Sequence, residues 1–156
     1  MFHRLFVALI AAVGLLVTAI PALAGPPTTT ITHEKGLVET FVDVVPTCEG
    51  GGPLYEITTT SNLVLKESFF DNGNIHATFT QTGTFVAVPF EDPSLPSYTG
   101  HFTTWSGFNQ MGSTVNGTFT FSVRGVGSDG STFTNHNVGH FNVRPDGSVN
   151  EFFKCH

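Results

Sequence analysis

The sequence has few charged residues and lacks any cluster of positive ones. Charged side chains make up 12% of the 156 residues, about half of the usual share in soluble proteins. Six Lys and Arg stand against twelve Asp and Glu, so the formal net charge is −6. A chain without a basic patch lacks the electrostatic footprint that binds phosphate backbones or anionic lipid. We therefore expect no nucleic acid among its partners.

Signatures of catalysis are also missing. The chain contains no Gly-x-Ser-x-Gly turn that would expose a nucleophilic serine, and its acids are scattered, with only Glu91 and Asp92 adjacent. His136 and His140 share one face of a strand, but four strand residues span about 13 Å, which is too far for one metal ion. We predict no metal and no cofactor. Whether the chain is an enzyme stays open, with the balance against it.

Only one long apolar run occurs, and it lies at the N-terminus. Leu5 to Ile20 is too short and too rich in Ala and Gly for a good membrane span, which needs about 20 apolar residues. A positive start precedes it, and small residues follow at Ala22 and Ala24, where a signal peptidase reads them. We predict a signal peptide over 1–24, cleaved between Ala24 and Gly25. The protein is then secreted without a stable membrane anchor; the alternative is an uncleaved anchor.

Cysteine is scarce. The two cysteines, Cys48 and Cys155, both follow the predicted signal peptide, so an oxidising compartment would allow them to form a disulfide. In the chain-entropy model, a loop of roughly 100 residues contributes about 4 to 5 kcal/mol of stability. The alternative is two free, buried thiols.

Along most of the remaining chain, apolar and polar residues alternate with a period of two, and the segments are rich in Thr, Phe and Val. This pattern is typical of strands. No stretch sustains a helical period. We predict a flexible lead-in over 25–36 and a single all-β domain over 37–156, an antiparallel up-and-down meander of about eight strands. The predicted strands are Val38–Val45, Leu54–Thr60, Leu63–Phe70, Ile75–Val88, Tyr98–Phe108, Thr114–Val126, Ser131–Val143 and Ser148–Lys154.

A short Gly-x-Phe motif recurs within these strands, with each glycine on the same face as its phenylalanine. A missing side chain lets a strand bend, and a neighbouring ring can cover the gap. The predicted disulfide would also bring the first and last strands together, because bonded cysteines have Cα atoms about 4 to 7 Å apart. Both features favour a closed barrel; a β-sandwich is the alternative. The motif begins at Gly83, Gly100, Gly117 and Gly139.

The apolar parity of the strands defines the expected interior. An eight-stranded barrel is wide enough to hold one small ligand or to be filled by its own side chains. We expect a non-enzymatic, secreted protein that binds a small apolar ligand in this interior or acts at the cell envelope. The expected ligand-facing residues are Phe79, Gln81, Phe85, Phe102, Phe119, Phe121, Asn135 and Phe141.

Two other functions remain as alternatives: a barrel-type isomerase or cyclase, and an outer-membrane barrel. An enzyme would need polar residues inside, and an outer-membrane barrel would turn its Phe face toward lipid. Trp105 shares the parity of the polar face, where a lone exposed aromatic can mark a ligand surface; the alternative there is local packing. The oligomeric state is left open.

Three segments carry a resemblance. The run from Tyr55 to Val88, the stretch from Asp92 to Phe102 and the segment from Gly125 to Ser131 resemble small secreted actinobacterial proteins of unassigned function. The resemblance implies secretion and a β-fold and brings no site residues. In overall plan the chain is similar to lipocalin-like and allene-oxide-cyclase-like barrels, and such a likeness of architecture does not assign a function.

Overall fold

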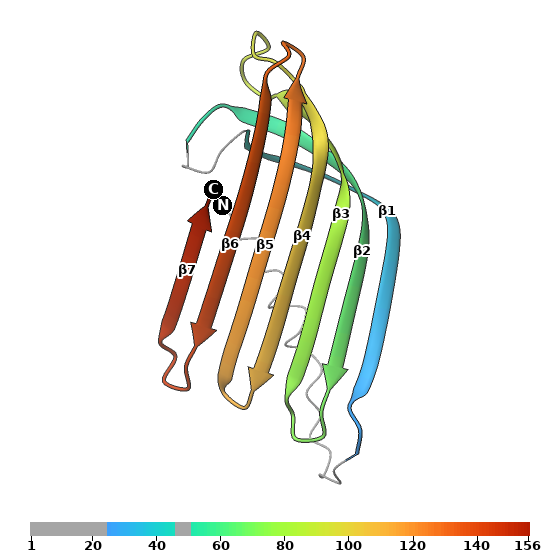
Figure 1. The fold of residues 1–156 in the computed structure, drawn as a ribbon, viewed down its shortest axis with the longest axis vertical. Coiled ribbons are helices and arrows are strands. Elements are labelled where there is room, and N and C mark those ends of the chain that lie inside the picture. Colours follow the sequence, from blue (N-terminus) through green and yellow to red (C-terminus); the bar gives the residue numbers. More distant parts are fainter. Residues whose placement is uncertain (1–24, 46–50) are drawn as a thin grey trace.

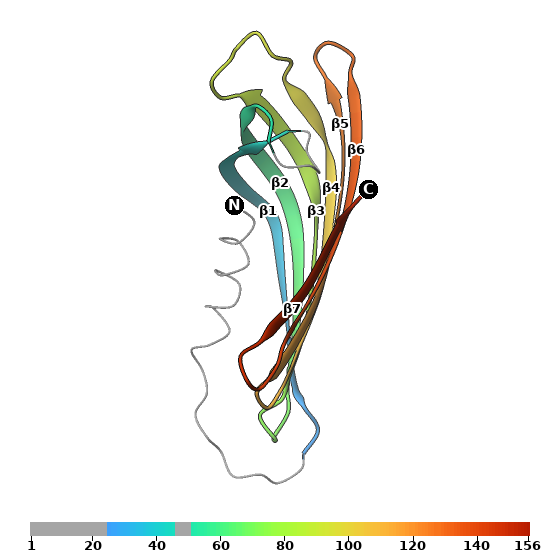
Figure 2. The ribbon, with the colours of Figure 1, turned by 90° about the vertical axis from the view of Figure 1, so that its left-hand side faces the viewer.

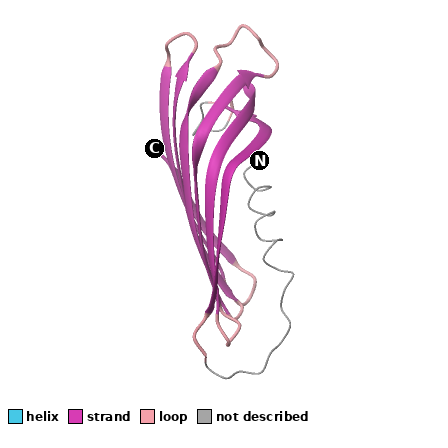
Figure 3. Cartoon of the chain, turned by 90° about the vertical axis from the view of Figure 1, so that its right-hand side faces the viewer, coloured by secondary structure: helices cyan, strands magenta, loops and turns pink. Residues whose placement is uncertain are grey.

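The computed structural model describes residues 25–45 and 51–156, and these form one antiparallel sheet. Seven strands lie side by side in chain order, from β1 at one edge to β7 at the other (Figure 1). Strands and their connecting loops are the only elements in this part of the chain (Figure 3). The strands are β1 Thr28–Val44, β2 Leu54–Phe69, β3 Ile75–Pro89, β4 Tyr98–Met111, β5 Thr114–Gly127, β6 Thr132–Val143 and β7 Val149–Cys155.

The prediction of an all-β, up-and-down antiparallel meander is confirmed, but the prediction of closure is wrong. Each strand pairs with its neighbours in sequence, and β1 and β7 stay at opposite edges of an open sheet. The structure therefore departs from lipocalin-like and allene-oxide-cyclase-like barrels, and equally from a two-sheet sandwich. Edge strands that carry charges resist pairing with another edge. Charged side chains occur along β1, and β7 has only seven residues.

Two boundary predictions also need correction. The residues from Thr28 to Gly36, expected in a flexible lead-in, belong to β1 because backbone hydrogen bonds to β2 hold an edge strand without an apolar pattern. Two of the predicted strands are joined in β2, so the sheet has seven strands rather than eight. Ser61 and Asn62 are the two residues left between these predicted strands. Ser61 is buried and accepts a hydrogen bond from Gln81 at 2.9 Å, so the strand continues through it.

Glycines with positive φ angles form the turns between strands. Gly73, Gly130 and Gly147 have positive φ angles of 79°, 84° and 81° in the turns after β2, β5 and β6, a conformation that glycine adopts without steric cost. Between β4 and β5 the turn is Gly112-Ser113, ahead of Asn116-Gly117. Gly112 has φ of 57°, as the first position of a type II′ hairpin turn requires.

The two faces of the sheet differ, and the core lies on one of them, which we call the inner face. Near the upper end of Figure 1 the inner face holds a buried cluster of Val45, Tyr55, Ile57, Phe85, Ala87 and Tyr98. Tyr98 packs edge-on against Tyr55 and Phe133, with ring centroids 5.7 and 5.4 Å apart. Figure 2 shows the upper ends of β1, β2 and β3 bending away from those of β5 and β6. This bend lets one sheet enclose a core.

The predicted disulfide cannot be placed. Cys48 lies outside the described residues, as do the predicted signal peptide over 1–24 and the Ala24 side of its cleavage site. Cys155 is the last residue of β7 and faces Asn137 of β6. The disulfide and the cleavage therefore stay predictions.

Candidate functional site

All eight residues expected to face a ligand lie on the inner face, but they do not share one environment. Phe85 and Phe102 are buried in the packed upper half of that face. Phe79, Phe119 and Phe141 are half-buried in its lower half. The upper aromatic residues therefore build the core, and the lower ones form a surface.

That surface, the lower aromatic patch, extends across six adjacent strands, β2 to β7. In register, Leu65 of β2 faces Phe79, and Phe108 of β4 faces Ala77 on one side and Gly117 on the other. The rings are partly exposed; Phe153 in β7 is 57% exposed. We define the patch as Leu65, Phe79, Phe108, Phe119, Phe141 and Phe153.

Glycines shape the floor of the inner face. Phe141 is the cross-strand partner of Gly117, and a Cβ at position 117 would lie 2.0 Å from its ring. Phe133 covers Gly125 in the same way, with 2.4 Å to a Cβ there. The ring that covers Gly117 thus comes from the neighbouring strand and not from Phe119 of its own Gly-x-Phe motif. Rings that lie over glycine keep the patch shallow.

A polar band separates the lower aromatic patch from the core. Gln81 donates hydrogen bonds to Ser61, at 2.9 Å, and to Glu39 of β1, at 3.1 Å. Asn137 is buried, and Asn135 is half-buried in the same strand. The inner face therefore offers an apolar surface beside a few hydrogen-bonding groups, a combination found in small-molecule sites.

Charges are segregated between the two faces of the strands. The inner face carries five acids and none of the basic or imidazole side chains of the described strands, whereas the outer face carries a single acid, Glu56. The inner acids are Glu34, Glu39, Asp43, Glu67 and Glu151. The outer-face cations and imidazoles are His33, Lys35, Lys66, His76, His101, Arg124, His136, His140, Lys154 and His156.

Four of the outer-face histidines, His76, His136, His140 and His156, lie against hydroxyl, amide or imidazole groups. The Nδ1 atom of His136 lies 2.7 Å from the Ser122 hydroxyl, and its ring stacks on that of His156 with centroids 6.4 Å apart. His76 Nδ1 lies 2.5 Å from Oδ1 of Asn109. Among residues 25–45 and 51–156, no three His, Cys, Asp or Glu side chains gather in a group that could hold a metal ion.

The buried polar side chains bear on the isomerase or cyclase alternative. An isomerase or cyclase site would need a buried carboxylate or imidazole in a cavity. The buried polar side chains of the described residues are Thr59, Ser61, Ser68 and Asn137. None of these four side chains is an acid or base at neutral pH.

An open depression lies along β3 to β6, lined mainly by outer-face residues and also by Phe85 and Phe133 of the inner face. It has a volume of about 600 Å³, and His101 and Arg124 sit within it as direct cross-strand partners. Its other outer-face lining is mostly hydroxyl-bearing, with Thr84, Thr99 and Thr134 around the two cationic side chains. The sequence did not reveal this feature, because the register between β4 and β5 is what brings His101 to Arg124.

Within the described residues, no helix is long and apolar enough to cross a membrane. Comparison of the chain with protein-family models, with curated proteins and with solved structures gives no match in any of the three.

Proposed function

We propose that the protein is an exported, non-enzymatic binding protein that holds an apolar or amphiphilic small molecule on its lower aromatic patch. The observation that carries this proposal is a set of half-buried, uncharged aromatic side chains across β3 to β6, continued by the exposed Phe153 of β7 and next to the polar band at Gln81 and Asn135. The sequence of residues 1–24 supports export.

The distribution of acids favours a ligand over a second copy of the chain as the occupant of the patch. The inner-face acids all lie in β1, β2 and β7, at the two sides of the sheet. Two inner faces pressed together would bring acidic rims close to one another without a basic partner, and such like-charge contacts oppose association. An uncharged or cationic amphiphile meets no such repulsion.

The polar band indicates how such a ligand would be oriented. Its apolar body would lie over Phe79, Phe119 and Phe141, and its polar end would reach toward Gln81. Burying most of a phenylalanine side chain against a ligand contributes about 1.5 to 3 kcal/mol. Loss of one such contact corresponds to roughly a tenfold or larger rise in Kd.

Titration with the neutral fluorescent probe N-phenyl-1-naphthylamine tests the proposal. We expect saturable binding with one probe per chain, weakened about tenfold or more by Phe119→Gln. Thr120→Gln is the matched control, because Thr120 is the next residue of β5 and lies on the outer face. The control should bind as the native chain does.

Two results would overturn the proposal. One is binding that does not saturate or that ignores Phe119→Gln. The other is a native dimer in light scattering that Phe119→Gln converts to a monomer, which would make a second copy the occupant of the patch.

A further inference from the structure

On the outer face, the indole of Trp105 is surrounded by hydroxyl groups. Trp105, in the middle of β4, is 40% exposed and is the only tryptophan in the chain. Its strand neighbours on this face are Thr103 and Gly107. Its lateral and diagonal neighbours all bear hydroxyls: Thr78, Thr80, Thr82, Thr118, Thr120 and Ser122.

Gly107 leaves space beside the indole. A Cβ at position 107 would lie 3.0 Å from Cη2 of Trp105 and 3.4 Å from Cζ2, so the six-membered ring of the indole occupies the position of the missing side chain. Thr78 and Thr118 flank Gly107 on the two adjacent strands. The Thr118 hydroxyl lies 3.2 Å from Nδ1 of His140, which holds it in place.

This arrangement fits a ligand with one apolar face and a polar rim. A wholly apolar ligand would find no second apolar side chain beside Trp105, because each of its neighbours is a hydroxyl residue or glycine. A pyranose ring has C–H bonds on one face and hydroxyls around its edge. The C–H face can stack on the exposed indole, and the hydroxyls can exchange hydrogen bonds with the surrounding threonines.

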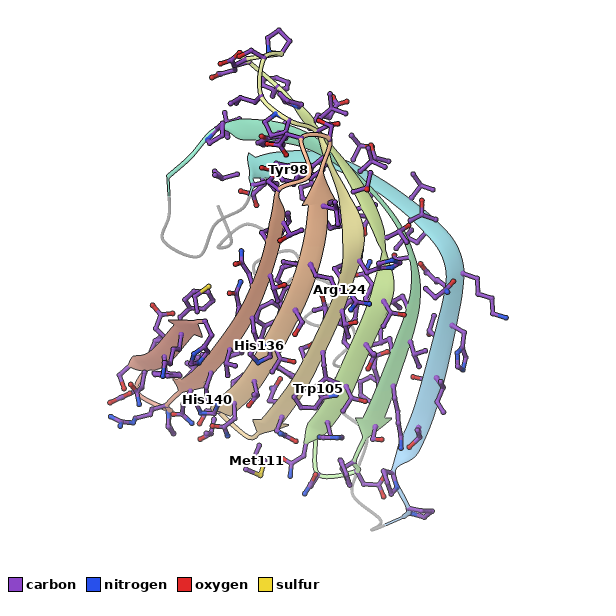
Figure 4. The ribbon with its side chains drawn as sticks, turned by 45° about the horizontal axis from the view of Figure 1, so that its top comes forward. Tyr98, Trp105, Met111, Arg124, His136 and His140 are labelled. Atoms are coloured by element: carbon purple, nitrogen blue, oxygen red, sulfur yellow. The ribbon has the colours of Figure 1, made fainter. Side chains whose placement is uncertain are left out.

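The depression at Arg124 adds a charge preference. Arg124 faces His101, which lies four residues before Trp105 in β4, or about 13 Å along the strand. Its other cross-strand partner is Thr134, and its neighbours along β5 on this face are Ser122 and Val126. No acid occupies these positions, so the guanidinium is available to a carboxylate of the ligand, which it can bind through two hydrogen bonds. Figure 4 labels Trp105 and Arg124 on the adjacent strands β4 and β5.

We propose that the outer face of β3 to β5 is a second binding site, which takes an acidic oligosaccharide with one sugar ring on Trp105 and a carboxylate at Arg124 and His101. The separation of the two anchors along β4 calls for a chain of sugars rather than a single ring. This site lies on the opposite face from the lower aromatic patch and does not depend on the function proposed for it.

Tetragalacturonate and its fully methyl-esterified form provide a matched pair of probes, because esterification removes the charges and keeps the sugar chain. We expect tetragalacturonate to change the fluorescence of Trp105 saturably and the ester to bind at least tenfold more weakly. Calorimetry should show that Trp105→Ala abolishes binding. Arg124→Gln should reduce the difference between the two probes to less than about twofold, whereas Phe119→Gln on the inner face should leave sugar binding unchanged.

Lys154→Gln is the charge control, because Lys154 is an outer-face cation on β7 and its loss changes the net charge by the same amount as Arg124→Gln. Equal weakening by the two variants would overturn the proposal, since binding would then follow overall charge. So would equal affinity for the acid and its ester, or an absence of binding at millimolar sugar. Binding to phosphatidylglycerol vesicles without binding to tetragalacturonate would also overturn it and assign the face to an anionic membrane.

Discussion

Gly117 should tolerate a methyl group far less well than Gly139, although both begin the same Gly-x-Phe motif. A Cβ at 117 would lie 2.0, 2.4 and 2.9 Å from three ring atoms of Phe141, whereas the nearest atoms to a Cβ at 139 are 3.7 Å away. In Gly117→Ala the ring must swing off the strand. Such overpacking costs about 1 to 3 kcal/mol.

The same substitution also has a favourable part, since glycine within a strand is destabilising by about 0.5 to 1 kcal/mol relative to alanine. We therefore expect Gly117→Ala to lower the free energy of unfolding by about 1 to 2 kcal/mol. Gly139→Ala lacks the clash and should raise it by up to about 1 kcal/mol. Removing the ring should reverse the first result: in a Phe141→Ala background, Gly117→Ala should be stabilising.

Urea denaturation followed by far-ultraviolet circular dichroism measures all four free energies of the double-mutant cycle. The expected coupling between positions 117 and 141 is about 1 to 3 kcal/mol, within the range seen for residues in direct contact. A coupling below about 0.5 kcal/mol would refute the reasoning, as that is the additivity error for independent sites. So would equal effects of Gly117→Ala and Gly139→Ala. An unchanged urea slope in the four proteins confirms that each unfolds from a comparable state.

Two further predictions concern covalent state and pH. The chain recovered from the culture medium should have the intact mass of residues 25–156 less two hydrogens, and a mass that includes residues 1–24 would contradict the cleavage. Reduction of the disulfide should lower the Tm by many degrees, and an unchanged Tm would contradict a stabilising disulfide. Hydrogen bonds from the hydroxyl and the backbone N–H of Ser94, Ser131 and Ser148 hold the pKa values of Asp92, Asp129 and Asp146 below the ordinary 3.8. Because these pKa values are lower in the folded state, the stability they contribute is present above about pH 4 and is lost as the pH falls through them. Urea denaturation at a series of pH values should show that the free energy of unfolding falls less toward acid pH when all three serines are changed to Ala. The same pH profile in the native chain and the triple variant would contradict this prediction.

The strands could be predicted from the sequence because most of them have one apolar and one polar face. Period-two alternation fixed the parity of β3 and β5 correctly. The first half of β1 escaped prediction because it lies at an edge and both of its faces are exposed. Its register with β2 rests on backbone hydrogen bonds, which leave no mark on side-chain patterning.

Closure of the sheet could not be predicted, because it depends on how the two edges meet rather than on any one strand. Two of the glycines that suggested barrel corners have another use in this fold: Gly100 and Gly117 make room for the rings of Phe85 and Phe141 from neighbouring strands. Bending is concentrated near the upper end, where Tyr55 and Tyr98 pack on the same core. A glycine within a strand can therefore mark either a barrel corner or a place where a neighbouring ring packs, and only long-range packing decides which of the two occurs.

In the candidate sites, strand parity could be predicted from the sequence but strand register could not. Parity alone placed Phe79, Phe119 and Phe141 on one face, but register decided that Phe85 and Phe102 join the core while the others stay near the surface. The pairing of His101 with Arg124 is purely a matter of register, because 22 residues of turn and strand separate them in sequence. A search of the sequence for adjacent basic residues could not have found it.

Net charge is a property of the whole chain, whereas a ligand meets one face of it. Besides the residues outside the strands, the sum of −6 includes an inner face with five strand acids and an outer face on which Lys35, Lys66, Arg124 and Lys154 are opposed by Glu56 alone. A strand can segregate its charges between the two faces without any change in amino-acid composition, because side chains of sequence neighbours point to opposite faces. Glu34 and Lys35 in β1 illustrate this. An acidic chain of this architecture can therefore present a local positive potential to an acidic sugar on one face while its other face favours uncharged or cationic amphiphiles.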